Sequence, residues 1–212
     1  MKRMTLIASN LIALAGIIGC AARPPVQNIE VPPRIELAPF QMIGVMEFDS
    51  ASKGKLAALA TRRFVEEARR DQGMLRMVDL GSRRALRSSG QKAWTPASYK
   101  AVGEEHGVQT IFLGELSVSD IKPSFNVEAV LRSGQITAQV DATLTVQLVE
   151  TATGASLWSA SARAAKSVGH ISVFRGREFI FDAEDPEAAY GVLVDALVER
   201  VTSDFRSTWV RR

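Results

Sequence analysis

The side chains that could carry chemistry are few and lie far apart in the sequence. Cys20 is the only cysteine, and the two histidines, His106 and His170, have no second ligand at the spacing of a metal site. We expect each histidine to lie at a surface or a helix end. Glycine-rich phosphate loops, nucleophile elbows and zinc-protease motifs are absent from the sequence. It therefore predicts a protein that is not an enzyme and that needs no metal or cofactor.

One acidic group precedes the last long apolar pattern of the chain. Its members are Asp182, Glu184, Asp185 and Glu187. Such a group could bind a cation. The N-terminal end of a helix also favours negative charge, because the helix dipole is positive there. The second interpretation is favoured, and it predicts the start of a helix.

Cys20 lies directly after an apolar stretch with a positive beginning at Lys2 and Arg3. Residues 4–19 are fewer than the ~20 that cross a bilayer as a helix, and they have the proportions of a secretory signal. The stretch Ile17-Ile18-Gly19-Cys20 resembles the lipobox of bacterial lipoproteins. In those proteins the signal is cleaved before the cysteine, here between Gly19 and Cys20, and the sulfur receives a diacylglycerol. The alternative is an ordinary signal peptide that ends in cysteine.

The lipobox implies a location for the mature protein. Three acyl chains on Cys20 make a lasting anchor, since each buried CH₂ contributes roughly 0.8 kcal/mol. By the sorting rule of enteric-type bacteria, Ala21 at the next position implies the periplasmic face of the outer membrane. A single cysteine permits no internal disulfide. Loss of Lys2 and Arg3 with the signal lowers the formal net charge from +3 to +1, and no basic stripe indicates nucleic-acid binding.

Three segments are predicted along the chain. Residues 1–19 are the lipoprotein signal, residues 20–39 a tether, and residues 40–212 a single domain. The tether is rich in proline, and its prolines are Pro24, Pro25, Pro32, Pro33 and Pro39. At ~3.1 Å per residue it reaches at most about 60 Å. The alternative is an ordered N-terminal arm that wraps around the domain.

Hydrophobic periodicity predicts an α/β domain, with a mixed sheet flanked by helices. The expected elements of its first half are strands at 42–48, 74–80 and 108–118 and helices at 53–71, 82–90 and 95–106. In the last helix Thr95 is expected as the N-cap, Pro96 as the first helical residue and Gly107 as the stop.

The strongest pattern is the alternation over residues 136–148, where every even position is apolar and every odd position is polar. This period of two predicts a long strand with one buried and one polar face. A turn at 151–154 and a return strand at 156–165 complete an antiparallel hairpin. A C-terminal helix is expected from Asp185, with a buried stripe made of Ala189, Val192, Leu193, Ala196, Leu197, Val201 and Phe205.

Five segments occur in a set order behind the lipobox: IGVMEFD at 43–49, MLRMVDLGSRRAL at 74–86, AVGEEHGVQTIFLGEL at 101–116, LTVQLVETATGASLWS at 144–159 and DPEAAYGVLVDALVERV at 185–201. This order resembles the curli-secretion (CsgG-type) lipoprotein superfamily. That superfamily also includes peptidoglycan-synthase activators of the LpoB type and exopolysaccharide-export lipoproteins. The resemblance implies an α/β fold like the anticodon-binding domain, used to bind proteins and build rings, with no active site.

Three functions fit this resemblance. The favoured one is a non-enzymatic assembly or adaptor module for export or assembly of a surface polymer or appendage, able to form an oligomeric ring. The second is an activator of a peptidoglycan synthase, which must reach the inner membrane on a long tether. The third is a secretion-channel subunit, whose membrane hairpins would correspond to residues 125–141 and 168–182. The arms of both hairpins are shorter than the ~9–11 residues that cross a bilayer.

The expected partners are outer-membrane lipid through Cys20, other envelope proteins and further copies of the chain. Large apolar side chains of the two hairpins are the predicted partner contacts, because aromatic residues concentrate at interface centres. These residues are Phe125, Leu131, Phe174, Phe179 and Phe181. The alternative for the last three is that they pack beneath the C-terminal helix.

Overall fold

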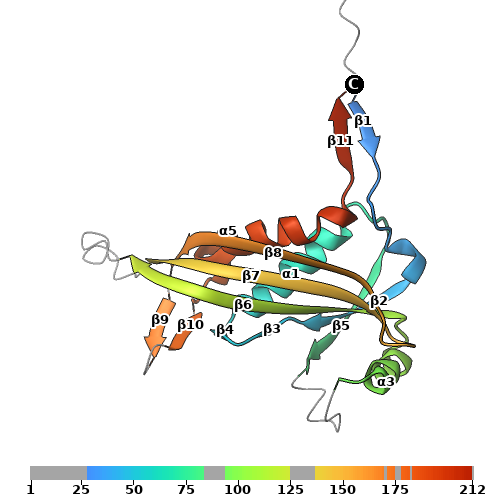
Figure 1. Cartoon of the computed structure of the whole chain (residues 1–212), viewed down its shortest axis with the longest axis horizontal. Helices are drawn as coiled ribbons and strands as arrows, with labels where there is room; N and C mark the ends of the chain where they lie inside the picture. Colours follow the sequence, from blue (N-terminus) through green and yellow to red (C-terminus); the bar gives the residue numbers. More distant parts are fainter. Residues whose placement is uncertain are drawn as a thin grey trace, which may run out of the picture.

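The computed structural model describes residues 28–83, 94–124, 137–169, 171–174, 178–181 and 183–211. Its centre is a six-stranded sheet, in which the short β3 (Asp49–Ser50) lies off the main path and pairs with β6 (Figure 1). Along that path the order is β5 (Arg76–Ser82), β2 (Met42–Glu47), β6 (Thr110–Ser124), β7 (Thr137–Glu150) and β8 (Ser156–Val168). β5, β2 and β6 are parallel, and β6, β7 and β8 are antiparallel. The predicted α/β class with a mixed sheet is confirmed.

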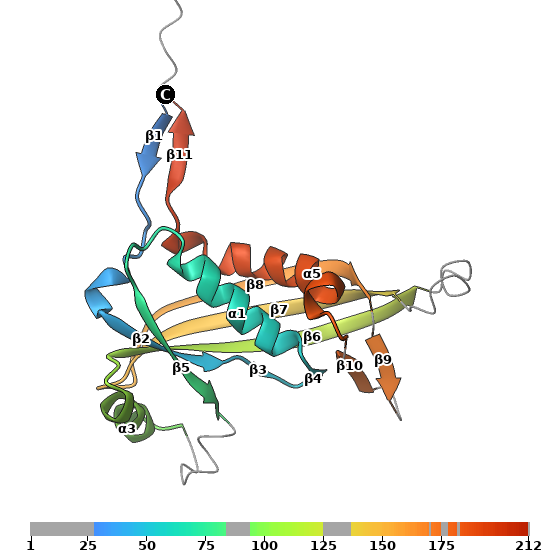
Figure 2. The same cartoon turned by 180° about the vertical axis from the view of Figure 1, so that it is seen from behind.

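Helices cover the two faces of this sheet unequally. α1 (Leu56–Arg69) and α5 (Pro186–Val201) lie together on one face, as Figure 2 shows. On the opposite face α3 (Pro96–His106) packs through the buried Val102, which belongs to a cluster with Ile111 and Val149. The rest of that second face is covered by no described helix, and the odd-numbered residues of β7 from Thr137 to Gln147 are polar.

The period-two pattern of β7 is confirmed by burial. Its apolar even positions, from Ala138 to Leu148, are all buried beneath the helices. On the other face Thr145 shares a hydrogen bond with Ser161 of β8 (3.0 Å), and Asp141 accepts a hydrogen bond from Arg163 Nε at 2.8 Å. The strand therefore separates an apolar core from a polar surface, as its sequence predicts.

The helix boundaries follow local capping chemistry. The Thr95 hydroxyl accepts from the Ser98 N–H at the start of α3, and Gly107 ends that helix at a φ of +66°. The Asp185 carboxylate accepts from the Ala188 N–H at 3.1 Å and caps α5. One prediction on α5 is wrong: Val192, expected in the buried stripe, is 64% exposed.

A second, three-stranded sheet lies beside the main one. It consists of β4 (Lys53–Gly54), β10 (Glu178–Phe181) and β9 (Ile171–Phe174). β9 and β10 are antiparallel, as the second predicted hairpin requires. For the first hairpin, residues 125–136 lie outside the described residues, and Ser124 pairs with Thr137 at the end of the described ladder. Most of the helix expected at 82–90 also lies outside them.

A third sheet is a two-stranded ribbon that projects away from the body (Figures 1 and 2). β1 (Asn28–Val31) pairs antiparallel with β11 (Thr208–Arg211), and every residue of both strands is exposed. Between β1 and β2 the chain passes through the buried Leu37 and a 3₁₀ turn, η1 (Ala38–Phe40). From Asn28 onward the chain is therefore an ordered arm, which differs from the tether predicted through residue 39.

None of the helices within the described ranges is long and apolar enough to cross a membrane.

Candidate functional site

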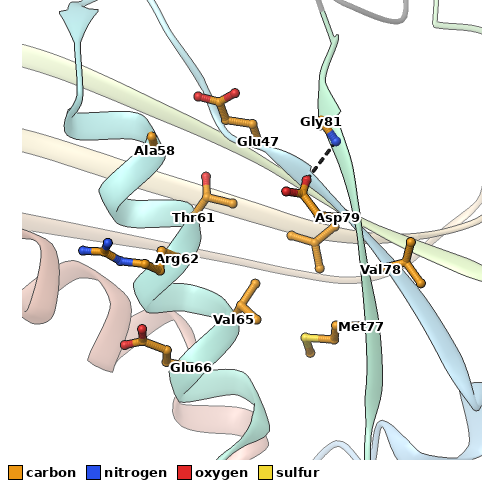
Figure 3. Close-up of a pocket in the computed structure, with 11 residues that line it drawn as sticks. Glu47, Ala58, Thr61, Arg62, Val65, Glu66, Met77, Val78, Asp79 and Gly81 are labelled. Atoms are coloured by element: carbon orange, nitrogen blue, oxygen red, sulfur yellow. Dashed lines mark hydrogen bonds between the residues drawn. The ribbon is translucent and has the colours of Figure 1, made fainter.

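A cleft of about 510 Å³ lies between α1 and the edge strand β5 (Figure 3). Five apolar side chains line it: Val45, Ala58, Val65, Met77 and Val78. Four charged side chains also line it: Glu47, Arg62, Glu66 and Asp79. An apolar lining with a few polar groups is common in ligand-binding pockets.

The cleft exists because of strand alternation and helix periodicity. Met77 and Asp79 lie two residues apart on β5, so both side chains emerge on the α1 side of the sheet. Ala58, Arg62 and Val65 recur at helical spacing on α1 and face the same space. β5 is the last strand of the sheet, and its outer edge pairs with no other described strand.

The polar groups of the cleft are occupied by structural hydrogen bonds. The Thr61 hydroxyl donates to the Ala57 carbonyl and accepts from the Phe48 N–H, both at 2.9 Å. Asp79 Oδ1 accepts from the Gly81 N–H at 2.8 Å, as Figure 3 shows. The lining contains no pair of nucleophile and base.

The charge around the cleft is negative overall. Arg62 donates to the carboxylate of Glu187, on α5, so its positive charge is already paired. Glu66 accepts from Arg63 at 3.1 Å, but Arg63 also donates to Glu187 at 2.6 Å and is shared between the two. The hydrogen bond that Arg63 donates to Glu187 raises the pKa of Arg63. Glu47 and Asp79 have no such cationic partner among the described residues, and a basic ligand would complement them.

The ribbon is a second exposed surface, and it is amphipathic. Directly paired residues share a face, so Ile29 and Val210 lie on the same side as Val31 and Thr208. The first three are exposed aliphatic side chains. The other face carries Glu30 opposite Trp209, whose side chain is 65% exposed. An apolar strip of this kind that is exposed to solvent is typical of an interaction surface.

The base of the ribbon is fixed to the body by Gln72, a buried amide beyond the end of α1. Gln72 Oε1 accepts from the Leu37 N–H at 2.6 Å. Its Nε2 donates to the carbonyls of Phe205 (2.7 Å) and Ile35 (3.0 Å). One side chain thus joins α1, the N-terminal arm and η2 (Ser203–Phe205), which leads into β11.

Asp204 of η2 adds a second fixing point. Its carbonyl accepts from the Ile35 N–H, and its carboxylate accepts from Arg34 (3.1 Å) and from Trp158 Nε1 (3.2 Å). Neither Gln72 nor Asp204 was predicted from the sequence. Nothing in their immediate sequence distinguishes the buried amide of Gln72, or the hydrogen-bonded carboxylate of Asp204, from a free surface group.

Of the five predicted partner contacts, the structure describes the side chain of Phe181 alone. Phe181 is buried, and its ring lies 5.3 Å from that of Tyr190 on α5. It belongs to the core, which corrects its assignment as a partner contact and agrees with the alternative. Phe174 and Phe179 lie on β9 and β10, but their side chains are outside the description. Phe125 and Leu131 lie outside the described residues altogether.

The remaining candidate residues also divide into those that the structure describes and those that lie outside the described residues. Gly19, Cys20, His170 and Asp182 lie outside the described residues, so lipidation at Cys20 stays a prediction. His106 ends α3, as expected. The described acidic residues near 185 serve the start of α5, with Asp185 as its cap. No group of three or more possible metal ligands occurs in the part of the chain that the structure describes.

No family model matches the sequence, and no curated protein matches it. Among solved structures, the PelC dodecamer from Paraburkholderia phytofirmans is similar at 12% identity and a TM-score of 0.45, covering 85% of this chain and 96% of that one. The LpoB C-terminal domain from Escherichia coli is 18% identical over 60% of this chain and 84% of that one, with a TM-score of 0.36. Lipoprotein GNA1162 from Neisseria meningitidis is 14% identical over 59% and 83%, also at 0.36. Likeness to the CsgG type stays a prediction.

Proposed function

We propose that the protein is a lipoprotein anchored in the outer membrane through Cys20, and that it works as a non-enzymatic assembly module at the periplasmic face of that membrane. The observation that carries the proposal is the pairing of β1 with β11 from Asn28 onward. Only eight residue steps separate Cys20 from Asn28. Fully extended, they span at most about 29 Å at ~3.6 Å per residue.

This short link supports one of two functions that fit the sequence over the other. An activator of an inner-membrane synthase needs a tether that is long enough to reach from the outer membrane to that enzyme. Here the free link is about half of the 60 Å that a tether through residue 39 would supply. The link therefore favours a partner at the same membrane as the anchor.

The secretion-channel alternative receives no support from the second hairpin. β9 and β10 have four residues each, and β10 also pairs with β4 of the body. A membrane-crossing strand needs ~9–11 residues. Both strands are accordingly assigned to the body in this proposal.

The cleft between α1 and β5 is the surface that we assign to the partner. Its apolar floor suits an aliphatic segment, and the carboxylates of Glu47 and Asp79 suit flanking lysine or arginine residues. We therefore expect the occupant to be a segment of another envelope protein, apolar at its centre and basic beside it.

The anchor is tested by labelling with palmitate in cells. Wild-type protein should be labelled and recovered with the outer membrane, whereas Cys20→Ala should be unlabelled and remain as uncleaved precursor. Ala22→Ser, beside the lipobox, is the matched control and should behave as wild type. Labelling that persists in Cys20→Ala would refute the anchor.

The partner site is tested by photo-cross-linking from position 77 within the cleft. We expect a product that fractionates with the outer membrane and that is reduced several-fold by Glu47→Lys. Glu104→Lys, an exposed charge reversal on α3, is the control and should leave the product unchanged. A product that contains an inner-membrane synthase, or one indifferent to Glu47→Lys, would contradict the proposal.

A further inference from the structure

The ribbon of β1 and β11 has an apolar face that no described residue of the chain covers. Ile29, Val31 and Val210 are exposed together on that face, and Trp209 is exposed on the other. A two-stranded sheet is only marginally stable in water by itself. Its exposed aliphatic and aromatic side chains indicate that a further surface covers it.

The position of the ribbon identifies that surface. Asn28 pairs with Arg211 at the ribbon tip, which points away from the body (Figures 1 and 2). The chain toward Cys20 continues from this tip, across a link of at most about 29 Å. Within the described part of the protein, the tip is therefore the region closest along the chain to the acyl chains of the anchor.

The residue types at the tip suit a phospholipid surface. Tryptophan is enriched at membrane–water interfaces, where its ring is amphipathic and its N–H can remain hydrated. Arg211 supplies a guanidinium that can pair with lipid phosphate while its aliphatic stem follows apolar surface. Ile29 and Val210 form the adjacent rung and are the aliphatic residues nearest the tip.

We propose that the ribbon is a second membrane contact, lying in the headgroup region of the leaflet that holds the acyl chains of Cys20. The inference rests on the lipid anchor of the proposed function. An acyl anchor alone lets the body rotate freely, whereas an anchor together with the ribbon fixes its orientation. The four residues of each strand span about 13 Å at ~3.3 Å per residue, so a ribbon in the headgroup region keeps the body outside it.

The experiment uses the fact that the sequence has one cysteine. Acylation consumes the Cys20 thiol, so Val210→Cys introduces a single reactive thiol for an environment-sensitive dye. Leu157→Cys on β8 is the matched control, since Leu157 is 46% exposed and Val210 is 48% exposed. Both full-length, palmitate-labelled variants are reconstituted in phosphatidylethanolamine–phosphatidylglycerol vesicles, with and without brominated acyl chains.

We expect the dye at position 210 to shift to the blue on vesicles and to be quenched by the brominated lipid, while the dye at position 157 does neither. Adding Trp209→Ser to Val210→Cys should weaken the quenching without unfolding the body. Palmitate-labelled protein that floats with vesicles, but whose position 210 is unquenched, would overturn the ribbon contact and leave the anchor intact. A blue shift without quenching, growing with protein density, would assign the ribbon to a second copy instead. Protein without palmitate would refute the proposed function itself.

Discussion

Two antiparallel sheets of the described structure, the β6–β7–β8 ladder and the β1–β11 ribbon, differ in what holds them together. β6, β7 and β8 form a ladder whose inner face is buried under α1 and α5. β1 and β11 form a ladder of four residue pairs with no buried residue on either face. The first is stabilised by burial of apolar surface, and the second is held chiefly at its base.

This difference implies two levels of stability in one chain. Burial makes the body a cooperative unit, whereas exposed backbone hydrogen bonds open with a smaller free energy. The contacts of Gln72 lie at the junction of the two. Substitutions in the body, at the junction and in the ribbon should therefore have graded effects on unfolding.

Phe112→Ala should have the largest effect. Its ring lies 5.0 Å from Phe64, 6.2 Å from Trp158 and 5.7 Å from Phe205, so its removal leaves a cavity at the centre of the core. We expect the free energy of unfolding to fall by about 3–5 kcal/mol, as measured by urea denaturation. A loss below about 1 kcal/mol would show that the body is not held by this cluster.

Gln72→Met should have the next largest effect. The substitution keeps the volume but leaves the Leu37 N–H and the Phe205 and Ile35 carbonyls without their partner. We expect a loss of about 2–3 kcal/mol, since a buried group left unpaired costs about 1–3 kcal/mol. Hydrogen exchange should also accelerate at β1 and β11 more than at β7; equal acceleration would contradict the role of the junction.

Asp141→Asn should have a smaller effect that depends on pH. The hydrogen bond from Arg163 lowers the pKa of Asp141 below its ordinary value of 3.8, so the ion pair stabilises the folded state above that value. This contribution is lost as the pH falls through the lowered pKa. We therefore expect Asp141→Asn to be less stable than wild type at neutral pH and equally stable well below pH 3.8. The double variant with Arg163→Gln isolates the pair, and added salt should weaken it because it is exposed.

Ile29→Ser should have the smallest effect on unfolding. Ile29 lies on the exposed face of the ribbon, and surface substitutions usually change stability by less than about 0.5 kcal/mol. Ile29→Val is the conservative control. If Ile29→Ser destabilised the body as much as Gln72→Met does, the ribbon would be part of the cooperative core and the comparison would fail.

The elements with a periodic apolar pattern could be predicted from the sequence. Alternation placed β7 and β8, and capping residues placed both ends of α3 and the start of α5. These predictions succeeded because burial and capping each require particular residue types at nearby positions in the sequence. Val192 shows where such prediction fails, since an apolar residue at helical spacing is exposed when no described element covers it.

The ribbon and the cleft could not be predicted in the same way. β1 and β11 have four residues each, which is too short for alternation to indicate a strand, and their pairing joins segments from opposite ends of the described chain. The cleft depends on the strand order that leaves β5 at the edge. The hydrogen bonds of Gln72 depend on the path of the N-terminal arm. The burial of Phe181 depends on its contact with Tyr190 of α5. All four depend on tertiary arrangement.

If the chain is exported as we propose, the pairing of β1 with β11 implies an order of events during biogenesis. Asn28 would cross the inner membrane early, and its partner Arg211 would follow only after nearly the whole domain. Closing so long a loop is entropically costly until the intervening body has folded and brought the two segments together. We therefore expect β1 to stay unpaired until the body has folded, and its pairing with β11 to be the last step of folding.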